Sequence, residues 1–124
     1  HYSTHAILKI AQQMVSTLHH LHICKVSHGD VYAHNTMINK DADVLFGDFG
    51  AATNLAMLSD YQQKQIELIE VRALGCLIED LIGTVTGDDR QSELFVKMSD
   101  MAKRAMQPTL NQRPTFTELL AELK

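Results

Sequence analysis

Residues 27–35 read Ser-His-Gly-Asp-Val-Tyr-Ala-His-Asn, and residues 47–50 read Gly-Asp-Phe-Gly. Asp30 is followed five positions later by Asn35, and Asp48 lies thirteen positions beyond Asn35. A loop carboxylate can accept the proton of an attacking hydroxyl, while carboxylate and amide oxygens are the ligands that Mg²⁺ prefers. This order of side chains predicts that all three converge on a metal-bound triphosphate, with Asp30 as the base and Asn35 and Asp48 as metal ligands.

Two short apolar runs lie between these motifs, at residues 36–39 and 44–46, and the polar residues 40–43 separate them. Short apolar runs around a polar turn predict a small β-hairpin. Because the two strands of a hairpin are antiparallel, the hairpin would bring the Asn35 end and the Asp48 end side by side. The spacing of the motifs therefore has a physical reason.

The rest of the chain is predicted to be mainly helical. Apolar residues recur at intervals of three and four over 4–22, 66–82 and 95–106, which predicts three helices, and Thr115 and Glu118 have capping-box spacing at the start of a fourth. The segment 66–82 is the most apolar and is expected to be buried on most sides. The predicted fold class is thus mainly α, a helical bundle with a small β-hairpin that carries both motifs. The segments predicted to be irregular are 25–35 and 51–65.

The composition of the chain is that of one globular domain. It has 124 residues, of which 45% are hydrophobic and 21% charged, and a net charge of -4. Its apolar runs are too short for a membrane span, and scattered Lys and Arg with a negative net charge argue against a nucleic-acid partner. Cys24 and Cys76 have no paired spacing, so we expect a reduced, cytoplasmic setting.

The motifs resemble the catalytic loop and the metal-binding turn of the protein kinase family. Three further segments resemble the same family in the right order. Residues 18–22 with 26–28 resemble the entry to the catalytic loop, and residues 70–75 (Glu-Val-Arg-Ala-Leu-Gly) resemble the family's Asp-x-Trp-Ser-x-Gly segment. Residues 111–114 (Asn-Gln-Arg-Pro) resemble the Arg-Pro segment near the end of the domain. The resemblance covers essentially the whole chain.

The resemblance implies that residues 1–124 are the C-terminal lobe of a protein kinase domain, in a compact form similar to bacterial-type kinases. No Gly-x-Gly occurs in the chain, so the Gly-rich N-terminal lobe is expected ahead of residue 1 in the parent protein. That lobe would be a partner of this one. Residues 1–124 alone are expected to be inactive, because half of the nucleotide cleft would lie elsewhere.

For the reaction, the resemblance implies transfer of the γ-phosphoryl group of ATP to a protein hydroxyl, with Ser and Thr favoured over Tyr. Asp30 would be the catalytic base, and Asp48 would link Mg²⁺ to the β- and γ-phosphates. Asn35 would bind a second Mg²⁺. Met37 falls where the family packs an apolar side chain under adenine.

The resemblance also implies residues that support the site. His28 and Phe49 would stack and hold the metal-binding turn, which Gly50 completes. Glu70 would accept backbone hydrogen bonds from the catalytic loop, in place of the usual, shorter Asp.

Arg113 is implied as a further support, through a buried ion pair with an acid near the activation segment. The family's Ala-Pro-Glu is absent from this chain, so the expected acidic partner is Asp60 or Glu67.

Two departures from the family pattern keep other functions open. Gly29 stands where many protein kinases have Arg, and small-molecule kinases of the aminoglycoside or choline type also favour His-Gly-Asp-x-x-x-x-Asn. The Phe-Gly after Asp48 and the segments 70–75 and 111–114 favour a protein kinase over that alternative. Tyr32 stands where Ser/Thr kinases usually have Lys, and a phenol carries no positive charge at neutral pH. The third alternative is therefore a pseudokinase-like interaction module that binds partners without catalysis.

Overall fold

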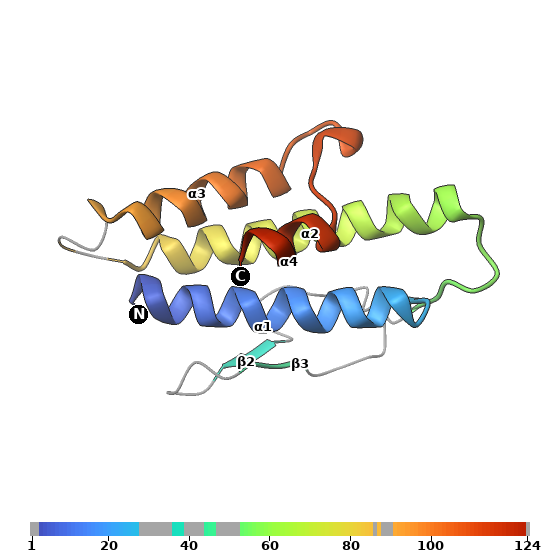
Figure 1. Ribbon diagram of the computed structural model, residues 1–124, viewed down its shortest axis with the longest axis horizontal. Helices are drawn as coiled ribbons and strands as arrows, with labels where there is room; N and C mark the ends of the chain where they lie inside the picture. Colours follow the sequence, from blue (N-terminus) through green and yellow to red (C-terminus); the bar gives the residue numbers. More distant parts are fainter. Residues whose placement is uncertain are drawn as a thin grey trace.

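The computed structural model describes residues 3–27, 36–38, 44–46, 53–85, 87 and 91–123. These residues form a bundle of α-helices with four short strands. The α-helices are α1 (Thr4–Ile23), α2 (Asp60–Ile82), α3 (Glu93–Ala105) and α4 (Phe116–Glu122), and a 3-10 helix, η4, spans Leu110–Gln112. Figure 1 shows α3, α2 and α1 stacked in that order, with α4 packed against α1.

The strands form two separate antiparallel pairs. β2 (Thr36–Ile38) pairs with β3 (Val44–Phe46), so that Thr36 lies opposite Phe46 and Ile38 opposite Val44. The predicted hairpin is confirmed. Figure 1 shows it beside α1, on the side away from α2 and α3. The second pair, β1 (Val26–Ser27) with β4 (Thr53–Asn54), lies in segments that were predicted to be irregular. Strands of two residues are too short to produce a periodic pattern.

Helix α1 confirms the helix predicted over 4–22. The Ser3 side chain accepts a hydrogen bond from the Ala6 amide and caps its first turn. The helix ends in a turn that contains Lys25, whose φ of 63° lies in the left-handed region. A residue with a side chain adopts that conformation at a cost, so neighbouring contacts must hold the turn.

Helix α2 begins at Asp60, six residues earlier than the apolar pattern predicted. Ser59 and Gln62 form a capping box there, and the first turns are polar because they face solvent. The expectation that 66–82 is buried on most sides holds for its inner face but fails at Ile69, which is 58% exposed.

The core lies between the four helices. Phe116 and Leu119 of α4 pack with the inner faces of α1, α2 and α3 in one buried cluster. The methionines Met98 and Met101 are buried in this cluster. Among the described residues, no helix combines the length and the apolar character needed to cross a membrane.

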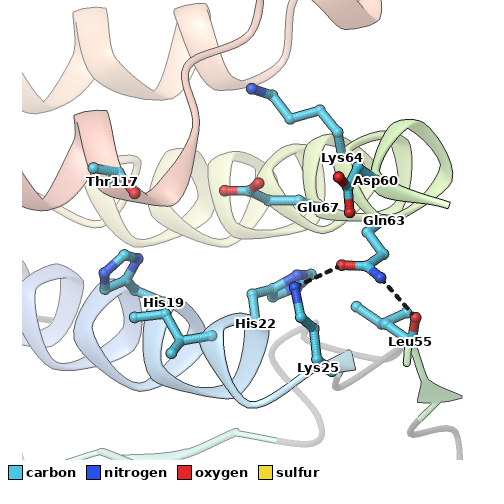
Figure 2. Close-up of a pocket in the computed structure, with 10 residues that line it drawn as sticks. His19, His22, Lys25, Leu55, Asp60, Gln63, Lys64, Glu67 and Thr117 are labelled. Atoms are coloured by element: carbon cyan, nitrogen blue, oxygen red, sulfur yellow. Dashed lines mark hydrogen bonds between the residues drawn. The ribbon is translucent and has the colours of Figure 1, made fainter. Parts of the chain in front are cut away.

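Polar contacts hold the turn that follows α1 against the first turns of α2. The Lys25 ammonium donates to the Gln63 side-chain carbonyl at 3.0 Å, and the Gln63 amide donates to the Leu55 carbonyl at 2.9 Å, as Figure 2 shows. The Leu55 amide in turn donates to the Lys25 carbonyl at 2.7 Å. These contacts fix the residues that follow β4 against the end of α1 and stabilise the left-handed turn.

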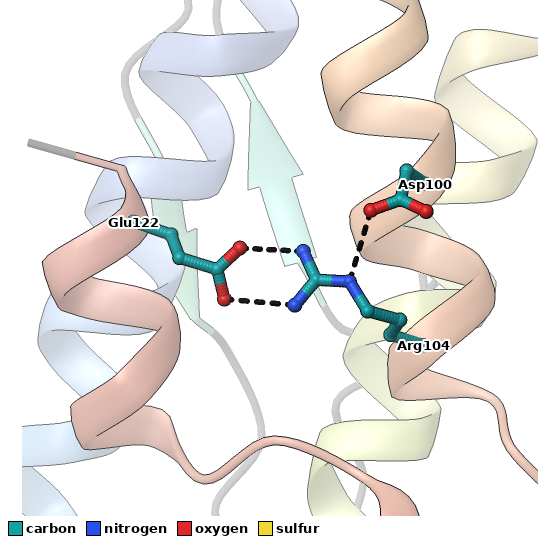
Figure 3. A network of polar contacts seen from close by, with 3 residues as sticks. All are labelled: Asp100, Arg104 and Glu122. Atoms are coloured by element: carbon teal, nitrogen blue, oxygen red, sulfur yellow. Dashed lines mark hydrogen bonds and ion pairs between the residues drawn. The ribbon is translucent and has the colours of Figure 1, made fainter.

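A second polar network joins α3 to α4. The Arg104 guanidinium pairs with both carboxylate oxygens of Glu122 on α4, and its Nε donates to Asp100 at 3.0 Å (Figure 3). The hydrogen bonds to Glu122 raise the pKa of Arg104 above its ordinary value. Bidentate geometry of this kind fixes orientation as well as distance.

Gly75 marks the closest approach of α2 to α3. A Cβ at this position would lie 2.8 Å from Ala105 Cβ, 3.0 Å from Met106 Cγ and 3.1 Å from the Ala102 carbonyl oxygen. These distances are shorter than normal contacts, and one of the atoms belongs to the backbone. The two helices can pack at this distance only because residue 75 has no side chain.

We therefore expect Gly75→Ala to lower the free energy of unfolding by about 1–2 kcal/mol, since overpacking outweighs the helix propensity of Ala. Urea unfolding measures the effect. Gly83→Ala is the control, because Gly83 has a right-handed helical φ of -59° and its nearest neighbour to a Cβ is at 3.3 Å. The control should differ from wild type by at most about 0.5 kcal/mol. Equal stability of all three proteins would contradict the close α2–α3 contact.

Candidate functional site

Three of the predicted site residues lie in the part of the chain that the structure describes. Met37 lies in β2 opposite Leu45, Glu70 lies on α2, and Arg113 directly follows η4. The roles predicted for the other site residues stay predictions, since these residues lie outside the described ranges. They are His28, Asp30, Asn35, Asp48, Phe49 and Gly50.

The two strand pairs bracket both predicted motifs. Residues 28–35 connect β1 to β2, and residues 47–52 connect β3 to β4. Because β1 pairs with β4 and β2 pairs with β3, the two connecting segments share the same two anchoring strand pairs. At one anchor Ser27 lies opposite Thr53, and at the other Thr36 lies opposite Phe46. The described residues on either side of one motif segment thus lie opposite those on either side of the other.

Glu70 is the centre of a buried polar cluster. Its side chain is only 4% exposed, and its Oε2 accepts a hydrogen bond from the Ser27 hydroxyl. Its Oε1 lies 3.7 Å from Nε2 of His22, whose ring packs on Phe116 with centroids 5.3 Å apart. A carboxylate removed from water needs such polar neighbours, because an unpaired buried charge is strongly unfavourable. The cluster therefore ties α1, β1 and α2 to one another.

The sequence indicated Glu70 but missed Ser27 and His22. Ser27 is 2% exposed in a strand of two residues, which is too short for the sequence pattern to indicate its burial. His22 lies next to α4 only through the tertiary fold, and the sequence spacing of the two carries no sign of that contact.

Arg113 has other partners than predicted. Its Nε donates to the Gln107 carbonyl at 2.6 Å and one Nη donates to the Leu68 carbonyl at 3.0 Å. The predicted partner Glu67 instead accepts a hydrogen bond from the Phe116 amide at 2.9 Å, and Asp60 is exposed at the first turn of α2. The expectation of an ion pair with Asp60 or Glu67 is therefore wrong. Arg113 satisfies backbone carbonyls where α2 meets the chain before α4.

The environment of Arg113 disfavours its positive charge. Burial lowers the pKa of Arg113, and the neighbouring charge of Arg72 acts in the same direction. The two carbonyl oxygens partly offset these effects, because a guanidinium forms charge-assisted hydrogen bonds with them.

An open cavity of about 330 Å³ lies where the end of α1 faces the start of α2 (Figure 2). Its walls include both cations and anions, among them Lys25, Lys64, Asp60 and Glu67. Neither Glu70 nor Arg113, the predicted supporting residues that the structure describes, lines it. Among the residues described, no three His, Cys, Asp or Glu side chains gather closely enough to hold a metal ion.

Comparison with known families identifies the chain. The family model described as "Protein kinase domain" matches residues 1–69, which is more than half of the chain. The chain belongs to the protein kinase domain family. The match covers α1, both strand pairs and both predicted motifs, and it ends in α2 one residue before Glu70.

The chain is similar to individual proteins named as protein kinases. A probable cell division protein kinase of Encephalitozoon cuniculi is 19% identical over 94% of this chain and 52% of its own length. A probable cyclin-dependent serine/threonine-protein kinase of Dictyostelium discoideum is 20% identical over 87% of this chain and 20% of its own length. The serine/threonine-protein kinase pakG of the same organism is 44% identical over 46 residues, which are 37% of this chain and 4% of pakG. The chain thus spans about half or less of the kinases it matches.

A solved structure has the same fold. It is titled "A divergent kinase lacking the glycine-rich loop regulates membrane ultrastructure of the Toxoplasma parasitophorous vacuole", and it superposes with a TM-score of 0.73 at 17% identity. The superposition covers 92% of this kinase chain and 40% of the solved one. The predicted fold class, a mainly α arrangement like the C-terminal lobe of a protein kinase, is confirmed.

The Arg113 geometry gives a prediction for the stability of this kinase chain. Arg113→Lys should lower the free energy of unfolding by about 1–3 kcal/mol, because one ammonium cannot reproduce the fork that reaches both carbonyls. Urea unfolding of the variant and of the control Arg72→Lys measures the difference. Arg72 is exposed, so its replacement should change stability by at most about 0.5 kcal/mol. If the free energy of unfolding falls equally in the two variants, the directional hydrogen bonds of Arg113 do not stabilise the contact between α2 and the chain before α4.

Proposed function

We propose that the parent protein is an active, ATP-dependent protein kinase and that residues 1–124 are the C-terminal lobe of its catalytic domain. One observation carries the proposal: β1 pairs with β4 and β2 with β3, so the segments that contain Asp30 and Asp48 are anchored at the same two places. The described residues that flank the two segments lie opposite one another on both sides, Ser27 with Thr53 and Thr36 with Phe46. This arrangement supports a common site for the two carboxylates.

The chemistry of the side chains supports phosphoryl transfer. In the proposal Asp30 accepts the proton of the substrate hydroxyl and orients it. Asn35 and Asp48 offer amide and carboxylate oxygens, which are the ligands that Mg²⁺ prefers. Neither offers the sulfur or imidazole nitrogen typical of zinc sites. Bound Mg²⁺ would neutralise charge on the phosphates of ATP. Met37, in β2 and two residues after Asn35, would pack against the adenine ring.

The hydroxyl acceptor is proposed to be Ser or Thr in a protein. Support comes from the matched relatives, two of which are named as serine/threonine-protein kinases. The N-terminal lobe that completes the nucleotide cleft is proposed to precede residue 1 in the parent protein. We also propose a cytoplasmic location, which the free thiols of Cys24 and Cys76 favour.

A module without phosphoryl transfer is the second candidate. The solved structure with the same fold is titled a divergent kinase that lacks the glycine-rich loop, and Tyr32 departs from the usual Lys. Such a module would bind partners and would not need Asp30 as a base.

The proposal predicts distinct effects for the two carboxylates in the full-length parent protein. ATP with Mg²⁺ should raise the melting temperature of the wild type, because ligand binding stabilises the folded state. Asp48→Asn should abolish the Mg²⁺-dependent part of this shift. Asp30→Asn should retain the shift but slow phosphoryl transfer by about 10²- to 10⁴-fold, since it removes the base and leaves the metal ligands. Thermal melts and radiolabelled transfer to dephosphorylated casein measure the two effects.

Glu79→Gln is the control, an equivalent carboxylate-to-amide change at an exposed position of α2. It should match the wild type in both assays. Binding of ATP with no transfer by the wild type would support the module without catalysis. Transfer by Asp30→Asn at the wild-type rate would contradict the role assigned to Asp30.

A further inference from the structure

Ser27 occupies a position where three constraints meet. It pairs with Thr53 in the β1–β4 strand pair, it is 2% exposed, and its hydroxyl donates to Glu70 on α2. Residue 28, the first of the predicted catalytic segment, follows it directly. A side-chain contact at Ser27 therefore acts on the anchor from which that segment begins.

We propose that Ser27 is a positioning residue: its hydrogen bond to Glu70 fixes the β1–β4 strand pair on α2 and thereby orients the catalytic segment 28–35. This inference rests on the proposed function for its effect on catalysis. The hydroxyl touches neither ATP nor the acceptor in this proposal. It acts only through the backbone that leads to Asp30.

The strand pair needs such a contact because of its size. Each strand has two residues, and an isolated pair of short strands is marginally stable in water. Hydrogen bonds to a charged, buried acceptor are stronger and more directional than those between neutral groups. The Ser27–Glu70 contact can therefore set the position of β1 relative to α2 in a way that apolar packing of the neighbouring Val26 cannot.

The length of the Glu70 side chain is also needed for this hydrogen bond. Asp at this position, which the family usually has, would be shorter by one methylene and would withdraw the carboxylate by about one bond length, roughly 1.5 Å. A hydrogen bond does not tolerate a lengthening of that size. Ser27 and Glu70 therefore form a matched pair, and shortening Glu70 should remove the Ser27 hydrogen bond as well as weaken the other contacts of this carboxylate.

The test measures hydrogen exchange and phosphoryl transfer in the full-length parent protein. Ser27→Ala should speed exchange of the amides in 26–35 and 53–54 by about tenfold or more, the effect of losing one hydrogen bond to a charged acceptor. Exchange in α3 should stay unchanged. With Mg²⁺-ATP and dephosphorylated casein, kcat should fall about 10- to 100-fold while KM for ATP changes by less than about threefold, because misorientation affects the rate more than binding.

Further variants at Ser27, Glu70 and Ser16 sharpen the test. Ser27→Thr keeps a hydroxyl and should restore both readouts to within about threefold of wild type, whereas Ser27→Cys, similar in size but a weak donor, should behave like Ser27→Ala. In a Glu70→Asp background, Ser27→Ala should have no further effect, because the acceptor has already been withdrawn. Ser16→Ala, at an exposed position of α1, is the control and should match wild type.

The two readouts separate this inference from the proposed function. If the wild type transfers no phosphate, the proposed function fails, and local exchange still decides whether Ser27 positions the segment. Wild-type exchange in Ser27→Ala, or faster exchange spread equally into α3, would overturn the inference. Normal local exchange together with a lower kcat would overturn it as well.

Discussion

The burial of α2 against α1 and α3 is the constraint on which the rest of the structure depends. Its inner face contributes apolar side chains to the core, and at Gly75 it approaches α3 too closely for any side chain. The same buried face carries Glu70, the one charged residue among the described residues that are fully buried. Because a buried carboxylate requires polar partners, the register of α2 in the core also decides where β1 must lie. The hydrophobic core and the polar cluster are thus positioned by one helix, and neither can move without the other.

The short strands depend on the helices for their stability and position. Pairs of strands with two or three residues each contribute little stability of their own, so β1–β4 and β2–β3 rely on the helices beside them. Only Cys24 and Lys25 separate α1 from β1, and the Lys25–Gln63–Leu55 contacts fix the chain after β4 to the same corner. The strand pairs in turn flank the two segments that carry the predicted base and metal ligands. The helices therefore position the short strands between which the proposed chemistry is placed.

The sequence predicted features that depend on local patterns and missed those that depend on distant contacts. The span of α1, the β2–β3 hairpin and the Thr115–Glu118 capping box follow from apolar spacing and from capping rules, and all are present. The start of α2 was placed too late because its first turns face solvent and lack an apolar pattern. The carbonyl partners of Arg113 could not be predicted, since Leu68 and Gln107 become neighbours only after the helices pack. For the site, the motifs named candidate residues, and the strand pairing shows that the segments carrying them are flanked by paired strands; their convergence stays a prediction.

The polar cluster around Glu70 also helps to choose between the two candidate functions, a catalytic domain and a binding scaffold. Packing alone gives no reason to bury a carboxylate, because replacing buried ionic groups by apolar ones of similar size is often neutral or stabilising. Here the carboxylate is retained, with one methylene more than the family's usual Asp, and a serine hydroxyl from the strand before the catalytic segment donates to it. Glu70 is longer than Asp, and the Ser27 hydroxyl lies where it can donate to the longer side chain. The added methylene therefore does not leave the carboxylate without a hydrogen-bond donor. In our proposal this contact orients the catalytic segment, a property that phosphoryl transfer requires and that a binding scaffold does not, and it therefore favours the proposed kinase activity.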